Sequence, residues 1–546
     1  MTYLAVILLC LRPLISEQVS LCAGILFDIF FCLIFLLIVL KEKIIIAKPR
    51  IMSMLLFFCL IVLCTGFFSV NSFNSQREIF RVFNLFLVFV FVGFIGKRQR
   101  YLLLNGMIAV SFLIGLRAVY QSCGGMQYIS THFTPAQITQ GGFYGLELLK
   151  QKRAISFFVS PNLLASYLSM MILAVGGFLL QNISEKSRKK TIWLGVILMI
   201  LAVAFVATKS IGAYLGLAAG IIFFISQNKM RLIRWVILGA VFFCALLVMG
   251  NKRADCFLDF NNKDNSMVQR SFYWKSSMRM IQEHPFLGFG PASFGIVYPR
   301  FKAAQANETL YSHNMYLQMC AESGIFSLLC LVVFICSIFA CGMRGNHDLR
   351  KLGLLSAAFA FLMHNIVDYS FFISQTAYVW WVFMANIISW DKKEIEEPRQ
   401  SLGAGIFLKN CFVALAIFVI CFNYMDYAAE INLKRAEYLA KQKKYTLALS
   451  SVRKSLKFRI NNDNAYYVSA LLLRISDSRT FSPDVVDNYL KAIFLNPQYS
   501  FYPYELGKYF YEYGKAKEAK YFFERACRLY PTNPRFKAAL DKISYP

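Results

Sequence analysis

Residues 20–40 read SLCAGILFDIFFCLIFLLIVL, an unbroken apolar run with one charged side chain, Asp28. Similar runs occupy residues 51–70, 191–208 and 328–342. Each approaches the roughly 20 apolar residues that a helix needs to cross a bilayer. In lipid, a single segment can pair all its backbone polar groups only as a helix. The sequence therefore predicts an all-α polytopic membrane protein with about 12–13 spans.

Charge is distributed in a way that predicts the topology. The chain has 546 residues, 58% of them hydrophobic, and a formal net charge of +28. The basic residues cluster in alternate connectors, which the positive-inside rule assigns to the cytoplasm. These connectors are 41–50, 97–100, 186–190, 229–234, 344–351 and 392–399. This pattern argues against a nucleic-acid partner, and it places the long loop 251–317 and the C-terminal tail outside the cytoplasmic membrane.

The C-terminal tail differs in composition from the rest of the chain. After a last predicted span at 405–424, the sequence becomes rich in Lys, Glu, Tyr and Ala. Here Ala492, Leu495 and Pro497 recur 34 residues later as Ala526, Leu529 and Pro531. This spacing resembles the tetratricopeptide repeat, in which small residues let paired helices approach. We expect a membrane domain at 1–424 and a repeat tail at 425–546, which either docks a partner protein or acceptor or simply covers the outer face.

Polar residues within or beside the spans are costly, so they are candidates for function. Lys209 lies at the outward edge of a predicted span. His364 and Asp368 lie one turn apart near the outward end of another. Such a pair either lines a polar cavity or forms a satisfied structural cluster, and the sequence favours neither.

The 251–317 loop holds the clearest chemistry. Arg270, Lys275 and Arg279 are cations suited to a phosphate or diphosphate. His313 is the candidate general base or acid, because its ordinary pKa lies near neutrality. His284 precedes Pro285, which favours a structural role in a turn. No Cys or His spacing indicates a metal site, and no cofactor is expected.

Several motifs occur in a fixed order around this loop. They resemble the signature of the O-antigen ligase and polymerase superfamily, bacterial membrane enzymes that act on lipid-linked glycans. The flanking segments 160–168 and His364–Asp368 resemble the upstream and downstream spans of that superfamily. The loop motifs are Arg270, Trp274, Pro285, Gly288, Gly290, Phe294 and Tyr298, then Ser312-His313-Asn314, Tyr316-Leu317 and Glu322-Ser323-Gly324.

The resemblance implies a metal-independent, inverting glycosyltransferase in the bacterial cytoplasmic membrane. Its donor would be a glycan on undecaprenyl diphosphate, bound from the outer side. Arg270 would hold the diphosphate and stabilise the leaving group, and His313 would activate or orient the acceptor. Without a metal, arginine must neutralise the charge that develops on the diphosphate. Further substrate-binding residues implied are Lys209, Arg279, Tyr316, Glu322 and Asp368.

One position departs from the family pattern. Ile211 stands where the family usually carries an arginine that is a second phosphate ligand. Lys209, two residues earlier, is the candidate substitute, although a lysine offers a point charge instead of a planar fork.

Membership does not fix the acceptor. A ligase joins O-antigen to lipid A–core, a polymerase extends a glycan, and a protein O-oligosaccharyltransferase modifies protein. The expected partners are membrane lipids, the donor, a lipid or protein acceptor, and a protein at the tail. The alternative of another class is a transporter of the lipid-linked glycan, but the internal repeats typical of transporters are not evident.

Overall fold

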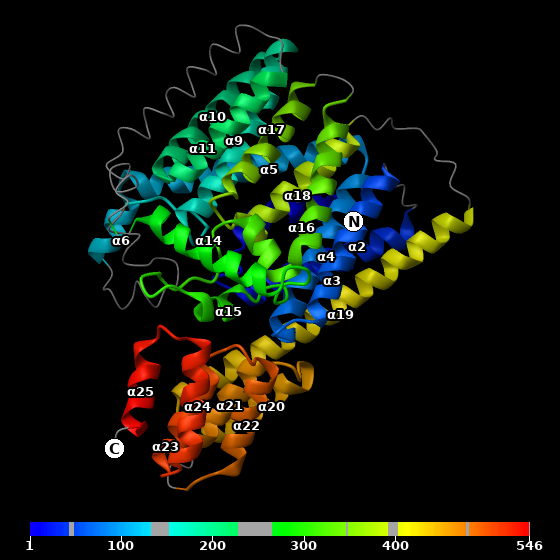
Figure 1. The fold of residues 1–546 in the computed structure, drawn as a ribbon. Helices are drawn as coiled ribbons and strands as arrows, with labels where there is room; N and C mark the ends of the chain where they lie inside the picture. The colour runs from blue at the N-terminus through cyan, green and yellow to red at the C-terminus, as the bar shows by residue number, and fades with distance from the viewer. Residues whose placement is uncertain are drawn as a thin grey trace. The chain divides into compact units, whose positions relative to one another are not determined.

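The computed structural model describes residues 1–42, 48–132, 152–227, 262, 265–344, 348–390, 402–476 and 480–544. All regular secondary structure in these residues is helical (Figure 1). The chain forms two compact units. The first contains Met1–Leu56, Phe83–Phe260 and Leu331–Ile420, and the second contains Phe57–Val82, Asn261–Cys330 and Cys421–Pro546. The tail therefore belongs to the same unit as the segment that carries Arg270 and His313.

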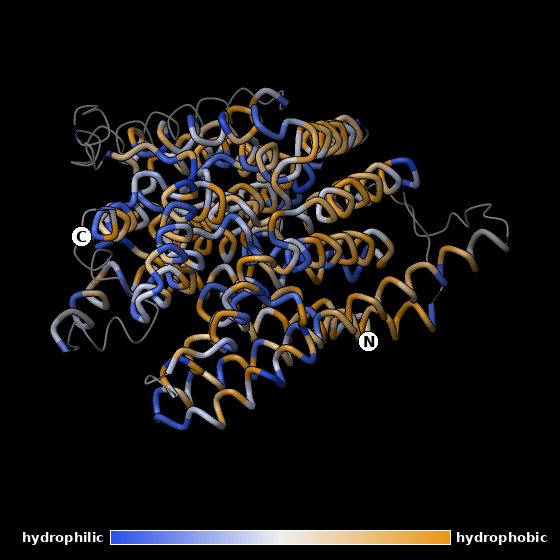
Figure 2. Tube along the Cα trace, turned by 60° about the horizontal axis from the view of Figure 1, so that its bottom comes forward, coloured by the Kyte–Doolittle hydropathy of each residue, from blue (hydrophilic) through white to orange (hydrophobic). Residues whose placement is uncertain are grey.

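Seven helices of the described chain are long and apolar enough to cross a membrane. Two shorter apolar helices, Thr2–Leu14 and Ile211–Gln227, accompany them. Their apolar character is visible along the trace in Figure 2. The predicted basic connectors 229–234 and 392–399 lie outside the described residues. The seven helices are Leu21–Lys41, Pro49–Phe67, Lys97–Tyr128, Pro161–Ser184, Arg188–Ala207, Met315–Gly342 and Ile406–Lys441.

The first unit is built from helices that begin at polar caps and run through apolar sequence. Ser20 accepts a hydrogen bond from the Ala23 amide at the start of α2, and Asp348 accepts one from Arg350 at the start of α17. Such caps satisfy amides that have no partner within the helix. The main elements are α1 (Thr2–Leu11), α2 (Leu21–Lys41), α5 (Lys97–Tyr120), α9 (Pro161–Ser184), α10 (Arg188–Ala207), α11 (Ile211–Gln227), α17 (Leu349–His364) and α18 (Ser374–Ser389).

Small residues bring α9, α11 and α17 together. A Cβ on Gly177 of α9 would lie 2.8 Å from the Cα of Gly353 on α17. A Cβ on Gly220 of α11 would lie 2.9 Å from the Ser356 carbonyl oxygen of α17. In lipid, helices associate through such close packing rather than through a hydrophobic driving force. A third such contact lies at the end of α17, where a Cβ on Gly216 of α11 would lie 2.9 Å from the His364 Cβ.

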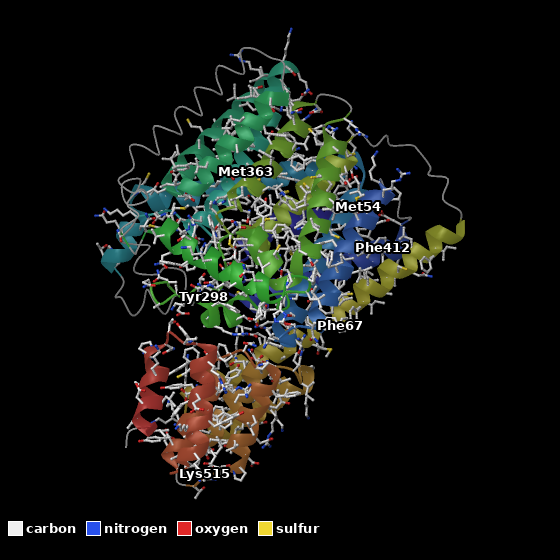
Figure 3. The ribbon with its side chains drawn as sticks, in the orientation of Figure 1. Met54, Phe67, Tyr298, Met363, Phe412 and Lys515 are labelled. Atoms are coloured by element: carbon white, nitrogen blue, oxygen red, sulfur yellow. The ribbon has the colours of Figure 1, made fainter. Side chains whose placement is uncertain are left out.

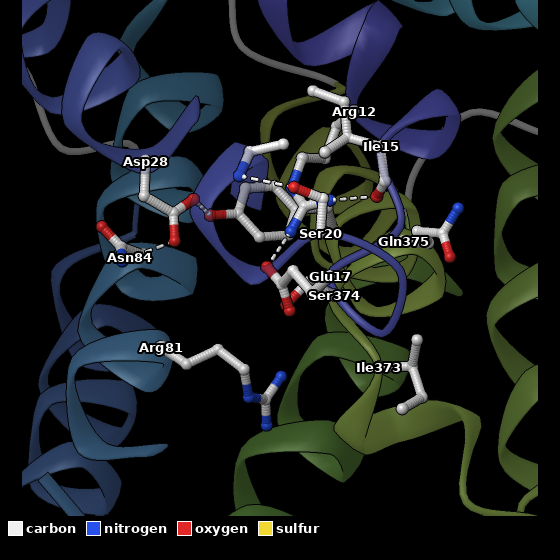
Figure 4. A network of polar contacts seen from close by, with 12 residues as sticks. Arg12, Ile15, Glu17, Ser20, Asp28, Arg81, Asn84, Ile373, Ser374 and Gln375 are labelled. Carbon is white, nitrogen blue, oxygen red and sulfur yellow. Dashed lines mark hydrogen bonds and ion pairs between the residues drawn. The ribbon is translucent and has the colours of Figure 1, made fainter. Parts of the chain in front are cut away.

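A buried polar network joins the N-terminal helices to α18 (Figure 4). Arg12 is fully buried and forms an ion pair with Glu17, which also accepts a hydrogen bond from Ser374 at 2.8 Å. Asp28 accepts hydrogen bonds from Tyr378 at 2.5 Å and from Asn84 at 3.0 Å. Buried charges require such partners. The carboxylate of Asp28 is thus paired with side chains of two other helices, residues 72–94 and α18.

The second unit contains the described part of the predicted loop. Residues 251–261, 263 and 264 of that loop lie outside the described residues, while 265–314 contain two helices, α14 (Ser266–Glu283) and α15 (Phe294–Phe301). Four helices have residues in both units: α3 (Pro49–Phe67), α4 (Ser72–Phe94), α16 (Met315–Gly342) and α19 (Leu402–Lys441).

The tail is a series of short helices in which each packs against the next. Gly507 of α23 faces α24, and a Cβ there would lie 2.8 Å from the Phe523 ring and 3.3 Å from the Ala519 carbonyl oxygen. Helices α23 and α24 thus approach each other closely at Gly507 and Ala519. The tail helices after α19 are α20 (Tyr445–Phe458), α21 (Asp463–Ser476), α22 (Pro483–Leu495), α23 (Phe501–Glu512), α24 (Ala516–Leu529) and α25 (Pro534–Ser544).

Two kinds of backbone geometry recur in the tail, one at two turns and another at three helix ends. Lys443, after α19, and Gly514, after α23, have φ values of 61° and 72°. The residue that follows each of them, Lys444 or Lys515, donates its amide back into the preceding helix at 3.0 Å. Lys515 is labelled in Figure 3. Arg459, Asn496 and Tyr530 end α20, α22 and α24 with φ between −137° and −147°. The tail is thus internally repetitive, and its assignment as a tetratricopeptide array stays a prediction.

Candidate functional site

Helix α14 presents Arg270 and Tyr273 to the interior of the second unit. Asn265 caps the helix by accepting the Met267 amide at 2.8 Å, which fixes where the helix begins. Arg270 is 9% exposed and Tyr273 is 7% exposed. Arg279 is exposed, because nine residues amount to two and a half helical turns and place it opposite Arg270. The structure therefore does not bring Arg270 and Arg279 together as one phosphate site.

His313 lies directly before α16 in a constrained turn. Its φ is 53°, a left-handed conformation that non-glycine residues adopt at a cost. The turn is held on both sides: Ser312 donates to the Asn314 carbonyl oxygen at 2.7 Å, and the Asn314 side chain accepts the Tyr316 and Leu317 amides, each at 3.0 Å. Asn314 is thus the N-cap of α16. The Ser312-His313-Asn314 motif fixes the backbone on either side of a half-buried imidazole.

The imidazole of His313 lies against Tyr273. The two ring centroids are 5.7 Å apart with an interplanar angle of 26°. Tyr273 also packs edge to face with Tyr298 of α15, with the ring centroids 5.8 Å apart; Tyr298 is labelled in Figure 3. This cluster, together with Arg270 one turn earlier on α14, forms the core of the candidate site.

The surroundings of Tyr273 are strongly charged. Burial raises the pKa of Tyr273 above its ordinary value. The positive charges of Arg270 and Lys302 oppose that rise, and the carboxylate of Glu308 adds to it. The phenol therefore stays protonated at neutral pH beside His313. Lys302 and Glu308 were not singled out in the sequence, because nothing in their spacing relates them to Arg270.

Three glycines create a close crossing between the loop and α16. Gly288, Gly290 and Gly324 have φ values of 66°, 104° and 74°. The Phe289 and Gly290 amides donate to the Ala321 and Glu322 carbonyl oxygens at 3.0 and 2.8 Å, and a Cβ on Gly324 would lie 1.8 Å from the Phe286 carbonyl oxygen. Only glycine combines this backbone conformation with this approach. The two glycine motifs of the sequence are thus two sides of one contact.

The side chain of Glu322 accepts hydrogen bonds from within the protein. Its two carboxylate oxygens accept the Ala292 and Phe294 amides at 3.0 and 3.1 Å, and Gln318 donates to it at 3.2 Å. These amides lie at the start of α15, where a carboxylate compensates unpaired donors. The geometry indicates that Glu322 holds α15 in place. Tyr316, also named as a substrate-binding candidate, lies half-buried in the first turn of α16.

The first unit holds a second polar group that includes a residue missed in the sequence. Arg153 is buried, and it donates to the Thr208 carbonyl oxygen at 2.7 Å and to the Asn162 side chain at 2.9 Å. Ser210 donates to the same Asn162 oxygen at 2.9 Å. Lys209, with a φ of 50°, lies between these contacts and is half-buried. A guanidinium is therefore present at the start of α11, although Ile211 occupies the position at which the resemblance led us to expect an arginine.

In the sequence, only the position of Arg153 could have marked it as a candidate site residue. It ends a polar segment and directly precedes the apolar stretch that leads to Ser160-Pro161-Asn162. Nothing in that pattern indicated that the chain returns to place Arg153 beside Thr208.

His364 and Asp368 lie close together, but not as neighbours on one helix face, because α17 ends at His364 and Asp368 follows in a non-helical segment. The His364 Nδ1 and Asp368 Oδ2 atoms are 3.9 Å apart, and both side chains are buried. Ser370 donates to the same carboxylate. Gly212 and Gly216 of α11 pack on His364, so the pair lies close to the start of α11. The other carboxylate oxygen, Asp368 Oδ1, is buried without a hydrogen-bond partner among the described residues, so these residues do not fully satisfy the cluster. The substrate-binding role of Asp368 stays a prediction.

Among the described residues, no three His, Cys, Asp or Glu side chains gather as metal ligands would. No curated protein matches the sequence. Residues 194–332 match the family model described as O-antigen ligase. This match covers Lys209, Arg270, His313 and Glu322, and it supports the resemblance to the O-antigen ligase superfamily. A glycosyltransferase-like enzyme that uses lipid-linked glycan donors is what that family implies. The chain is therefore a multi-helix membrane protein that contains an O-antigen ligase-like segment.

Proposed function

We propose that the protein transfers a glycan from an undecaprenyl-diphosphate-linked donor to an acceptor hydroxyl on the outer side of the bacterial cytoplasmic membrane. The observation that carries this proposal is the cluster of Arg270, Tyr273 and His313, which lies within the O-antigen ligase-like segment. A cation and a titratable imidazole near one another are what this reaction requires.

In the proposed reaction, His313 accepts the proton of the acceptor hydroxyl as its oxygen attacks the anomeric carbon of the donor. The bond between that carbon and the diphosphate oxygen breaks, and undecaprenyl diphosphate leaves with the bonding electrons. Attack opposite the leaving group inverts the anomeric configuration. Arg270 neutralises the charge that develops on the diphosphate, a role suited to a bidentate guanidinium in a buried setting. No metal ion takes part in this scheme.

The proposed acceptor is a lipid-anchored glycan, as in a ligase. The support is the family description of the matched segment. A repeat tail on the outer side would suit a large acceptor, and the tetratricopeptide assignment and outer location are part of this proposal. Growth of a polymer or labelling of a protein would instead indicate a polymerase or an oligosaccharyltransferase.

The first prediction concerns Arg270 and His313. We expect Arg270→Ala and His313→Ala each to lower glycan transfer by on the order of 100-fold or more, because each removes a group that acts in the transition state. The measurement is transfer of radiolabelled glycan from undecaprenyl diphosphate in native membranes, at matched protein levels.

Arg300→Ala is the control, since Arg300 lies on the same loop and pairs at the surface with Glu283. It should transfer at the wild-type rate. Normal transfer by both the Arg270 and the His313 variants would show that this site assignment is wrong.

A further inference from the structure

The segment 302–312, between α15 and His313, is fastened by residues next to the candidate site. Gln269, the neighbour of Arg270, accepts the Asn307 amide at 2.7 Å and donates to the Gln305 carbonyl oxygen at 3.2 Å. Tyr298 donates to the Asn307 carbonyl oxygen at 3.0 Å. These bonds hold the middle of the segment against α14 and α15. They do not involve the side chains of Lys302 and Glu308, which lie on either side of this middle part.

Contacts to these two side chains come from the tail. The Tyr530 hydroxyl donates to the Glu308 carboxylate and accepts a hydrogen bond from Lys302 at 3.0 Å. The Lys302 nitrogen also lies 5.2 Å from the centre of the Tyr530 ring, within the range of a cation–π contact. Lys302 and Glu308 form an ion pair of their own. Because the Glu308 side chain is 60% exposed, that pair alone would contribute little.

Tyr530 is itself rigidly mounted. It follows α24 directly, and its amide donates to the Ala526 carbonyl oxygen at 2.9 Å. Its ring is 7% exposed and packs edge to face on Phe536 of α25 at 5.9 Å. A hydroxyl held this firmly can fix the two charged side chains that it contacts.

The first hairpin of the tail is anchored in a corresponding way. Arg459 and Asn461 donate to the Gln76 side chain at 2.9 and 3.0 Å, and Arg77 pairs with Asp426 and Glu430 at 2.9 and 3.0 Å. The first two turns of α4 and the residues just before it also support the loop. Ser75 donates to the Pro291 carbonyl oxygen at 2.6 Å, and the Val70 amide donates to the Phe289 carbonyl oxygen at 3.0 Å. Both ends of the tail therefore contact segments that build the candidate site.

We propose that Tyr530 is a positioning residue for glycan transfer: by holding Lys302 and Glu308, the last hairpin of the tail sets the position of the segment that ends in His313. This inference rests on the proposed function for its catalytic consequence. It makes the tail a working part of the site, in addition to any partner that the tail docks. Because the contact acts on the segment that leads to His313, whereas Arg270 belongs to α14, the tail governs the turnover step more than donor binding.

The test compares Tyr530→Phe with Tyr521→Phe in the full chain. The first variant removes the hydroxyl and keeps the ring that packs on Phe536. The second removes an exposed hydroxyl from α24 in the same tail. We expect Tyr530→Phe to lower kcat for transfer of radiolabelled glycan by on the order of tenfold, because small displacements of a catalytic group are costly. The donor KM should stay within about twofold, and Tyr521→Phe should behave as wild type.

Glu308→Gln should lower kcat in the same way. The double variant should be no slower than either single variant, because the two residues act as one unit. Additive losses would contradict the proposed contact.

A second readout needs no activity. Hydrogen–deuterium exchange of the full chain in nanodiscs should show faster exchange of the amides in 302–312 for Tyr530→Phe, and unchanged exchange for Tyr521→Phe. Faster exchange with an unchanged kcat would overturn the positioning role, as would a lowered kcat without faster exchange. If the wild-type protein transfers no glycan, the proposed function fails, and the exchange measurement alone decides whether Tyr530 holds the segment.

Discussion

At the scale of single residues, the crossing of residues 285–290 with the start of α16 shows how glycine decides local structure. Gly324 bends α16 with a positive φ, and Gly288 approaches the Glu322 carbonyl within a distance that admits no side chain. The sequence displayed these glycines as two separate motifs. Their mutual contact could not be predicted, because it joins positions about 35 residues apart through backbone groups that carry no sequence signal.

We expect Gly324→Ala to destabilise the protein by about 3 kcal/mol or more, since alanine adds both a strained φ and a collision with the Phe286 carbonyl oxygen. The measurement is the thermal unfolding midpoint of the purified protein in detergent. Gly195→Ala in α10 is the matched control, because a Cβ there meets no heavy atom within 4 Å. That variant should unfold at or slightly above the wild-type temperature. Equal midpoints for the two variants would refute the role of the crossing.

At the scale of elements, helical periodicity separates residues that the sequence groups together. Arg270 and Arg279 both looked like phosphate ligands while the region was expected to be a loop. Once α14 forms, they face opposite sides, and only Arg270 reaches the Tyr273 and His313 cluster. The candidate base could be predicted because His313 stands in a recognisable motif. The charged neighbours Lys302 and Glu308 could not, since they arrive through tertiary folding.

The carboxylate of Glu322 gives a prediction about α15. Glu322→Gln replaces one accepting oxygen by an NH₂ group that faces a backbone donor. We expect it to destabilise the start of α15 by about 1–3 kcal/mol, seen as faster hydrogen exchange in residues 289–301. Glu283→Gln, at a surface ion pair, should change this exchange little. If Glu322 instead binds substrate, its variant would raise the donor KM and leave the exchange unchanged.

At the scale of the whole molecule, hydropathy predicted the helical membrane class well, because each span must satisfy its own backbone. It could not predict the two compact units. The second unit assembles three stretches that are distant in sequence, and one of them is the tail. The contacts that join them, such as Arg77 with Asp426, involve ordinary surface-type residues that no periodicity marks.

The charge pattern also predicts an orientation that can be measured. Alkaline phosphatase is active only when it folds outside the cytoplasm. Fused after Pro546, it should be active, because the tail is expected on the outer side. Fused after Ser187, in a basic connector, it should be inactive. The reverse activities would contradict the predicted topology and with it the outer location of the candidate site.

The network around Arg12 has a consequence for biosynthesis. Membrane proteins are inserted from the N-terminus as they are translated, yet Asp28 takes one hydrogen bond from Tyr378, and Glu17 takes one from Ser374. Ribosomes must therefore add about 350 residues before α18 can complete the surroundings of the first two helices. Until then Asp28 relies on Asn84 or on water at the membrane surface, so the N-terminal helices should be the last part of this bundle to settle and the first to be recognised by quality-control proteases when translation stops early.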